Sequence, residues 1–114
     1  MSIEREPDHP IIDKPWQYDI AEFRYHVDPE DRWASFIDLH LRRGTVVRRL
    51  RFVGPQSLKI ETGFPDATGG MCILDIRERQ WEGLTVEVAD FEATYGAITF
   101  VARNVIDLDS EDDS

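Results

Sequence analysis

The sequence predicts a mainly β protein, an antiparallel sandwich or partly open barrel with one short helix. Short runs of alternating apolar and polar residues recur along the chain, β-branched and aromatic residues dominate these runs, and glycine or proline separates them. The 114 residues are enough for one domain with one core. We expect an extended, proline-containing arm at 1–15, a single β-rich domain at 16–106 and a disordered acidic tail at 107–114.

The first two apolar runs, at 16–20 and 23–27, alternate out of frame with each other. A one-residue slip between two such runs is typical of a β-bulge. The same residues also fit one face of a helix, but their aromatic and β-branched content favours strands. We therefore expect a bulged strand that begins near Trp16.

The segment 29–43 has two interpretations. The Asp-Pro pair at 28–29 is typical of a helix start, and the apolar spacing that follows fits a helix and a strand equally well. We expect one helical turn at 29–33 and then a strand to about residue 42. The reason is that a Gly-Thr turn and a returning strand at 46–53 follow, which together predict a hairpin. A full helix at 29–43, in an α+β fold, is the alternative.

Four more strands are expected, at 58–61, 72–77, 84–88 and 98–102, and the glycine-rich segment 63–70 reads as a loop. The inward apolar positions of the expected elements predict the core. These positions are Trp33, Ile37, Leu50, Phe52, Leu58, Ile60, Leu74, Ile76, Leu84, Val86, Val88, Ile98 and Phe100.

The net charge of −10 limits the classes of partner that the protein can bind. It argues against a dedicated nucleic-acid or anionic-membrane binder, and it is compatible with a basic protein partner. No run approaches the roughly 20 apolar residues of a membrane span. One cysteine cannot form an internal disulfide, and the charged N-terminus is no signal peptide, so we expect a cytoplasmic protein. The candidate partner-binding residues are the tail acids Asp107, Asp109, Glu111, Asp112 and Asp113.

Two histidines and two aspartates are the candidate metal ligands. His26 and Asp28 are two residues apart, and so are Asp38 and His40, so each pair shares one face if both segments are strands. Imidazole and carboxylate groups of this kind can ligate Zn²⁺. The simpler interpretation is a polar strand face in which Asp28 caps a turn. No catalytic motif or cofactor fingerprint is present, so we name no catalytic residue and no cofactor, and the balance is against an enzyme.

Five arginines lie within residues 42–51. A basic ribbon of this kind can contact phosphates. Because the chain as a whole is acidic, pairing of these arginines with acids on neighbouring strands or in the tail is the favoured interpretation.

Two stretches, together about half of the chain, contain strands, turns and a core aromatic in a recurring order. The first contains Leu50-Arg51-Phe52, Gly54-Pro55-Gln56, Leu58, Ile60-Glu61 and Gly63-Phe64-Pro65. The second contains Leu74-Asp75-Ile76-Arg77, Trp81-Glu82-Gly83-Leu84, Val88-Ala89-Asp90-Phe91-Glu92 and Ile98-Thr99-Phe100. This order resembles small uncharacterised bacterial proteins, some of the toxin-immunity kind. The resemblance implies a bacterial cytosolic β protein with an inhibitory binding role, and it transfers no functional residue.

The leading hypothesis is a non-catalytic, acidic, protein-binding or inhibitory (immunity-like) domain whose partner is basic. The alternative is a small-ligand or metal-binding domain, including an enzyme of an unrecognised kind. A third hypothesis is a homo-oligomer that pairs through an exposed strand edge or through the hairpin.

Overall fold

The computed structural model describes residues 7–64, 71–79, 83–90 and 97–109. These residues form strands and three short 3-10 turns, and they include no helix long and apolar enough to cross a membrane. In chain order the elements are η1 (Pro15–Gln17), β1 (Asp19–His26), η2 (Arg32–Ala34), β2 (Phe36–Arg43), β3 (Val46–Val53), β4 (Gln56–Ile60), β5 (Met71–Asp75), η3 (Arg77–Arg79), β6 (Val86–Asp90), β7 (Ile98–Ala102) and β8 (Asn104–Asp107).

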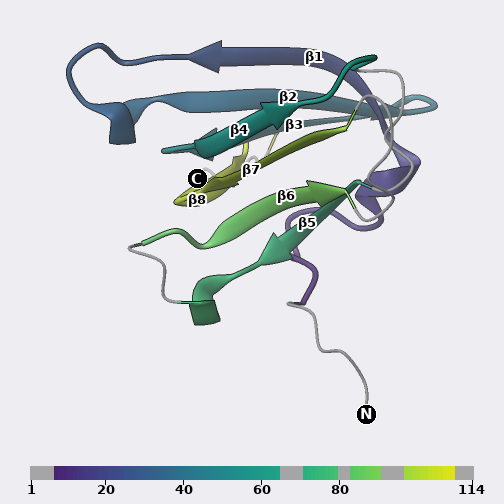
Figure 1. Ribbon diagram of the computed structural model, residues 1–114. Helices are drawn as coiled ribbons and strands as arrows, with labels where there is room; N and C mark the ends of the chain where they lie inside the picture. Colours follow the sequence, from purple (N-terminus) through teal and green to yellow (C-terminus); the bar gives the residue numbers. More distant parts are fainter. Residues whose placement is uncertain (1–6, 65–70, 80–82, 91–96, 110–114) are drawn as a thin grey trace.

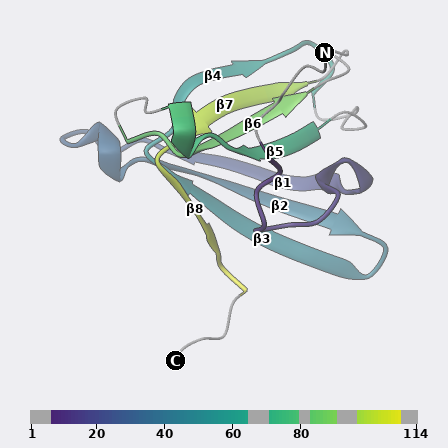
Figure 2. The ribbon, with the colours of Figure 1, turned by 90° about the horizontal axis from the view of Figure 1, so that it is seen from below.

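The strands form two antiparallel four-stranded sheets that pack as separate layers (Figures 1 and 2). One sheet has the order β1-β2-β3-β8 and the other the order β4-β7-β6-β5. The sheets do not close into a barrel. The predicted fold class, mainly β with an antiparallel sandwich, is confirmed.

Two strand pairs pass from one sheet into the other at a shared corner. The chain runs from β3 into β4 through Gly54-Pro55, and from β7 into β8 through Arg103. Because β3 pairs with β8 and β4 pairs with β7, the two connecting segments turn the corner side by side. Arg103 N donates to Val53 O at 2.8 Å and holds the two together at the bend. From the sequence only the strand at 98–102 was predicted here, and β8 was not.

The core lies between the layers and contains most of the predicted residues. Phe52 and Phe100 meet edge to face across the layers, with ring centroids 5.0 Å apart. Leu74, on the opposite face of β5, and Ile76, just after this strand, are buried in a second cluster with Cys72. Trp33, Leu58 and Leu84 are only partly buried. Ile60 was predicted inward but is 42% exposed, because it ends the edge strand β4 and has a neighbouring strand on one side only.

The segment 29–43 is a strand preceded by a short turn, so the alternative of a full helix is wrong. The side chains of Ile37, Leu39 and Leu41 are fully buried, and β2 pairs with β1 on one side and with β3 on the other. The helical turn is a 3-10 turn at Arg32–Ala34, which begins later than the expected 29–33. Hydrogen bonding to β1 and to β3 on its two edges stabilises this segment as a strand and not as a helix. The local sequence does not contain this information, because the partner strands are other parts of the chain.

The predicted bulge is confirmed, whereas the predicted start of the first strand is not. The register of β1 against β2 shifts between Ile20 and Glu22. Trp16 lies in η1 and not in the strand, because Pro15 begins a 3-10 turn that ends at Gln17. Strand β1 therefore begins at Asp19.

Both predicted terminal segments contribute to the fold. Asp8 forms an antiparallel bridge with Leu74, and His9 N donates to Ile73 O at 2.8 Å, so the described part of the arm lies along the edge of β5. Asp107 belongs to β8 and Asp109 to the turn that follows. Residues 1–6 of the predicted arm and 110–114 of the predicted tail lie outside the described residues.

The corner generates a stability prediction. Gly54 has φ 65°, and a Cβ at this position would lie 3.0 Å from Arg103 Cγ and from Trp33 Cε3. Gly44 has φ 62° but open space around it, so Gly44→Ala tests the backbone cost alone. We expect Gly44→Ala to lower the free energy of unfolding by about 1–2 kcal/mol and Gly54→Ala by about 2–3 kcal/mol, because crowding adds to the positive-φ cost. Urea unfolding measures both, and equal losses would contradict a crowded corner.

Candidate functional site

Three of the four predicted metal ligands share the outer face of the sheet β1-β2-β3-β8. His26 pairs with Phe36, and Asp38 and His40 follow on the same face of β2. Asp28 lies beyond the end of β1, in the turn that leads to η2. Asp38 and His40 thus share one face of a strand as expected, whereas Asp28 is not in a strand and the expected pairing of faces with His26 does not apply.

The shared face does not gather these side chains around one point. His26 stacks on Phe36 with ring centroids 4.9 Å apart, whereas His40 Nδ1 lies 3.3 Å from a carboxylate oxygen of Glu22. Asp38 is held by Arg51. In the part of the chain that the structure describes, no three His, Cys, Asp or Glu side chains are placed to hold a metal ion. The cation beside Asp38 is a guanidinium.

Arg51 is the centre of the outer-face network. Its Nε and Nη2 donate to the two carboxylate oxygens of Asp38 at 2.8 and 3.1 Å, and its guanidinium lies 3.9 Å from the ring centroid of Phe36. Asp38 is only 5% exposed, so the guanidinium compensates a buried charge. The hydrogen bond to Asp38 raises the pKa of Arg51.

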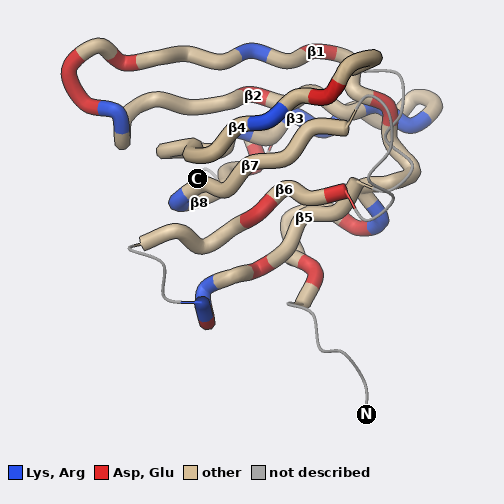
Figure 3. Tube along the Cα trace, viewed as in Figure 1, with Lys and Arg blue, Asp and Glu red and all other residues tan. Residues whose placement is uncertain are grey.

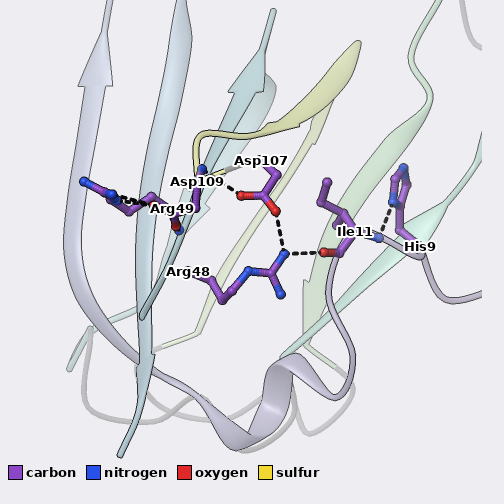
Figure 4. A network of polar contacts seen from close by, with 6 residues as sticks. All are labelled: His9, Ile11, Arg48, Arg49, Asp107 and Asp109. Carbon is purple, nitrogen blue, oxygen red and sulfur yellow. Dashed lines mark hydrogen bonds and ion pairs between the residues drawn. The ribbon is translucent and has the colours of Figure 1, made fainter. Parts of the chain in front are cut away.

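The described tail acids are held by neighbouring arginines (Figure 4). Arg48 Nη2 donates to Asp107 at 3.0 Å and to the backbone oxygen of Ile11 at 2.7 Å, so it joins β8 to the N-terminal segment. Arg49 donates from its backbone N and its Nε to Asp109 at 2.9 and 2.8 Å. The side-chain hydrogen bond from Arg49 lowers the pKa of Asp109. Asp107 and Asp109 are therefore engaged within the chain. Glu111, Asp112 and Asp113 lie outside the described residues.

The arginine ribbon is mostly engaged within the chain as well. Arg48, Arg49 and Arg51 each hold an aspartate. Arg43 lies over the ring of Tyr18, 4.9 Å from its centroid, and donates to Gln17. The three aspartate pairs agree with the favoured interpretation of the arginines as partners of acids, and the contact of Arg43 with an aromatic ring was not predicted.

The turn between β1 and β2 is the acidic surface that the sequence analysis did not single out. It runs from Val27 to Asp31, is mostly red in Figure 3, and is called the acidic turn below. The carboxylates of Asp28, Glu30 and Asp31 form no ion pair with any described residue. The sequence signal was present, but the acids were interpreted as a helix start.

Hydrogen bonds within the chain fix the shape of the acidic turn. Asp28 Oδ1 accepts from the backbone N of Glu30 and of Asp31, both at 2.9 Å, and Ser35 Oγ accepts from Asp28 N at 2.8 Å. Asp31 Oδ1 accepts from Trp33 N at 3.0 Å and caps η2. The two backbone hydrogen bonds lower the pKa of Asp28, and the neighbouring His26 adds a smaller effect in the same direction. The turn is therefore ordered and anionic at neutral pH.

Two exposed apolar side chains precede these carboxylates in the chain. Val27 is 64% exposed and Tyr25, near the end of β1, is 39% exposed. An exposed valine within an acidic, internally hydrogen-bonded turn offers both charge and apolar area to a partner.

The Asp38–Arg51 contact predicts an asymmetric mutational effect. Arg51→Ala leaves a buried carboxylate without its cation, so we expect a loss of about 2–3 kcal/mol in the free energy of unfolding. Asp38→Ala leaves an arginine that can reach water, and we expect a smaller loss. The double variant should be more stable than the sum of the two losses implies, by about 1 kcal/mol or more. Urea unfolding of the four proteins checks this, and a larger loss for Asp38→Ala would contradict it.

His9 predicts a pH effect on stability. Its Nδ1 accepts from Ile11 N at 3.1 Å, and burial lowers its pKa below 6.5, against a weaker opposing effect of Asp75. The unfolded chain therefore binds a proton at His9 first as the pH falls below about 6.5, and the free energy of unfolding decreases. His9→Asn keeps an acceptor without titrating. We expect the wild type to lose up to about 1 kcal/mol more than His9→Asn between pH 7.5 and 5, measured by urea unfolding. Parallel pH profiles would contradict this assignment.

Comparison with known proteins gives no further identity to these surfaces. The chain matches no protein-family model, no curated protein and no solved structure.

Proposed function

We propose that this protein is a non-catalytic protein-binding domain of the inhibitory, immunity-like kind, and that it engages a basic partner through the acidic turn. The observation that carries the proposal is an ordered turn whose carboxylates are unpaired among the described residues and lie beside exposed Val27. The proposal includes a bacterial cytoplasmic setting, which the single free thiol of Cys72 supports.

The distribution of charge supports the choice of the acidic turn over the tail acids. Elsewhere in the described chain, arginines pair with six carboxylates: Arg24–Glu22, Arg48–Asp107, Arg49–Asp109, Arg51–Asp38, Arg77–Asp75 and Arg79–Glu87. A carboxylate already paired within the chain gains less from a partner's lysine or arginine, because the internal pair must first be broken. The acidic turn does not have this cost.

The order of the turn supports binding as well. A loop that is flexible when free loses conformational entropy when it binds, and this loss reduces affinity. Here the capping hydrogen bonds of Asp28 and Asp31 hold the turn in one shape before a partner arrives. The exposed apolar surface of Val27 and Tyr25 can then be buried against the partner, while the carboxylates steer its approach.

Affinity capture with charge variants tests the proposal. Glu30 is exposed, and its carboxylate forms no hydrogen bond or ion pair with a described residue, so Glu30→Lys changes the charge of the turn and leaves the caps intact. Glu78→Lys makes the same change in net charge on η3 and is the matched control. We expect the tagged wild type to capture a basic protein from a lysate of the source cells, with loss at high salt. With that protein purified, Glu30→Lys should raise the Kd at least tenfold, which is about 1.4 kcal/mol, and Glu78→Lys should leave it nearly unchanged.

The apolar part of the surface has its own variant. Val27→Ser should weaken the same complex severalfold without altering its salt dependence, because it removes apolar area and no charge. Equal effects of Glu30→Lys and Glu78→Lys would show that only net charge matters. A complex insensitive to salt and to Glu30→Lys would refute the acidic turn as the binding surface.

A further inference from the structure

No described strand pairs with the outer edge of strand β1. It is the outermost strand of its sheet, and the backbone of residues 19–26 forms no hydrogen bond within the described chain except to β2 (Figure 1). The edge of β5, in contrast, is occupied by residues 7–9. Strand β8 has four residues, and β4 has five with an irregular register. The eight residues of β1 are therefore the longest open edge in the described structure.

The hairpin fixes which backbone groups face this open edge. Only Gly44 and Thr45 lie between β2 and β3, so Arg43 and Val46 form the hydrogen-bonded pair that closes the turn. Antiparallel strands alternate the direction of their backbone groups residue by residue. The even-numbered residues of β2 therefore point their N–H and C=O groups toward β1.

The same alternation continues into β1. Its even-numbered residues Glu22, Arg24 and His26 pair with the even-numbered residues of β2, so their backbone groups point inward. The N–H and C=O groups of Phe23 and Tyr25 then face the open edge. On the far side of the sheet the alternation agrees with the observed hydrogen bonds, since Leu108 N donates to Arg49 O and Arg103 N donates to Val53 O.

The open edge is complementary to a second copy of itself. In an antiparallel β1–β1 pair with its two-fold axis at Phe23, each Phe23 exchanges both hydrogen bonds with Phe23 of the other copy. Glu22 of each copy then lies directly opposite Arg24 of the other. Opposite charges in this position stabilise a strand pair, and like charges destabilise it. A two-fold axis at Glu22 or at Arg24 would place like charges opposite each other, so the charges select the register centred on Phe23.

We propose that β1 is a homodimer interface and that two copies pair antiparallel about Phe23, which joins their four-stranded sheets into one continuous sheet. The interface is isologous, as closed two-fold dimers require. It uses backbone groups on the edge of β1 and not the carboxylates of the acidic turn, so it does not depend on the proposed partner. Added salt screens the repulsion between two chains of net charge −10, so salt should favour this dimer and oppose binding of a basic partner.

Sedimentation equilibrium of the full chain tests the proposal. We expect the apparent mass to rise from 13.2 kDa toward twice that value with concentration in the micromolar to millimolar range. Glu22→Arg and Arg24→Glu should each weaken the dimer at least tenfold, which is about 1.4 kcal/mol, because each places like charges opposite each other. The double exchange E22R/R24E again places opposite charges across from each other and should return the dimerisation constant to within a few fold of the wild type. Glu78→Arg is the control for net charge.

A backbone variant separates edge pairing from side-chain effects. Tyr25→Pro removes an N–H that faces the open edge and none that faces β2, so the fold should persist, as circular dichroism can verify, and the dimer should be lost. Amide exchange of Phe23 should slow with protein concentration, whereas exchange of Arg24 should be slow throughout. A mass of 13.2 kDa at every concentration would overturn the proposal. So would a dimer that survives Tyr25→Pro, or a double exchange that fails to restore what the single exchanges remove.

Discussion

The corner at Gly54 and Arg103 determines the relative placement of both sheets and of the acidic turn. Here two paired segments of the chain, β3–β4 and β7–β8, pass together from one layer to the other. The bend between β3 and β4 has a positive φ at Gly54. The space left by the missing side chain is occupied by Arg103 and Trp33, whose guanidinium and ring lie 4.8 Å apart. Gly54 N also donates to Ser35 O at 2.8 Å. Since Trp33 and Ser35 flank the end of η2, the corner also anchors the segment from which the acidic turn extends.

The arginines of β3 affect the distribution of unpaired carboxylates on the surface more than they affect the free energy of unfolding. Arg49–Asp109 and similar exposed pairs contribute about 0–1 kcal/mol each, so their number says little about the free energy of unfolding. They do neutralise the described acids near β3 and β8, and through Arg48 they connect the N-terminal segment to the end of the chain. In the acidic turn, by contrast, three carboxylates close together in the chain form no ion pair with any described residue.

The sequence was sufficient for features that depend on neighbouring residues. Alternation predicted the class, the frame slip predicted the bulge between Ile20 and Glu22, and Gly44 predicted the hairpin. Features that depend on distant residues could not be predicted. The alternation of 98–106 does not show a change of sheet at Arg103, and the Asp-Pro start at 28–29 uses the same capping chemistry before a helix and before a turn. Asp38 and His40 share a face as expected, but identifying Arg51 as the cation for Asp38 required the register of β2 against β3.

Strand β1 brings the two proposed interfaces close together without making them compete. The edge-facing groups of Phe23 and Tyr25 lie along the side of the strand, whereas the acidic turn begins at its end. An antiparallel pair about Phe23 directs the two His26 ends in opposite directions, so the two acidic turns lie at opposite ends of the joined strands. A dimer of this geometry presents two separate acidic surfaces. If a partner is itself multivalent, binding at the second surface becomes intramolecular and gains effective concentration without any new contact. Pairing at the edge of β1 can therefore strengthen binding at the turn, although only Tyr25 belongs to both interfaces, through its backbone at the edge and its exposed side chain near the turn.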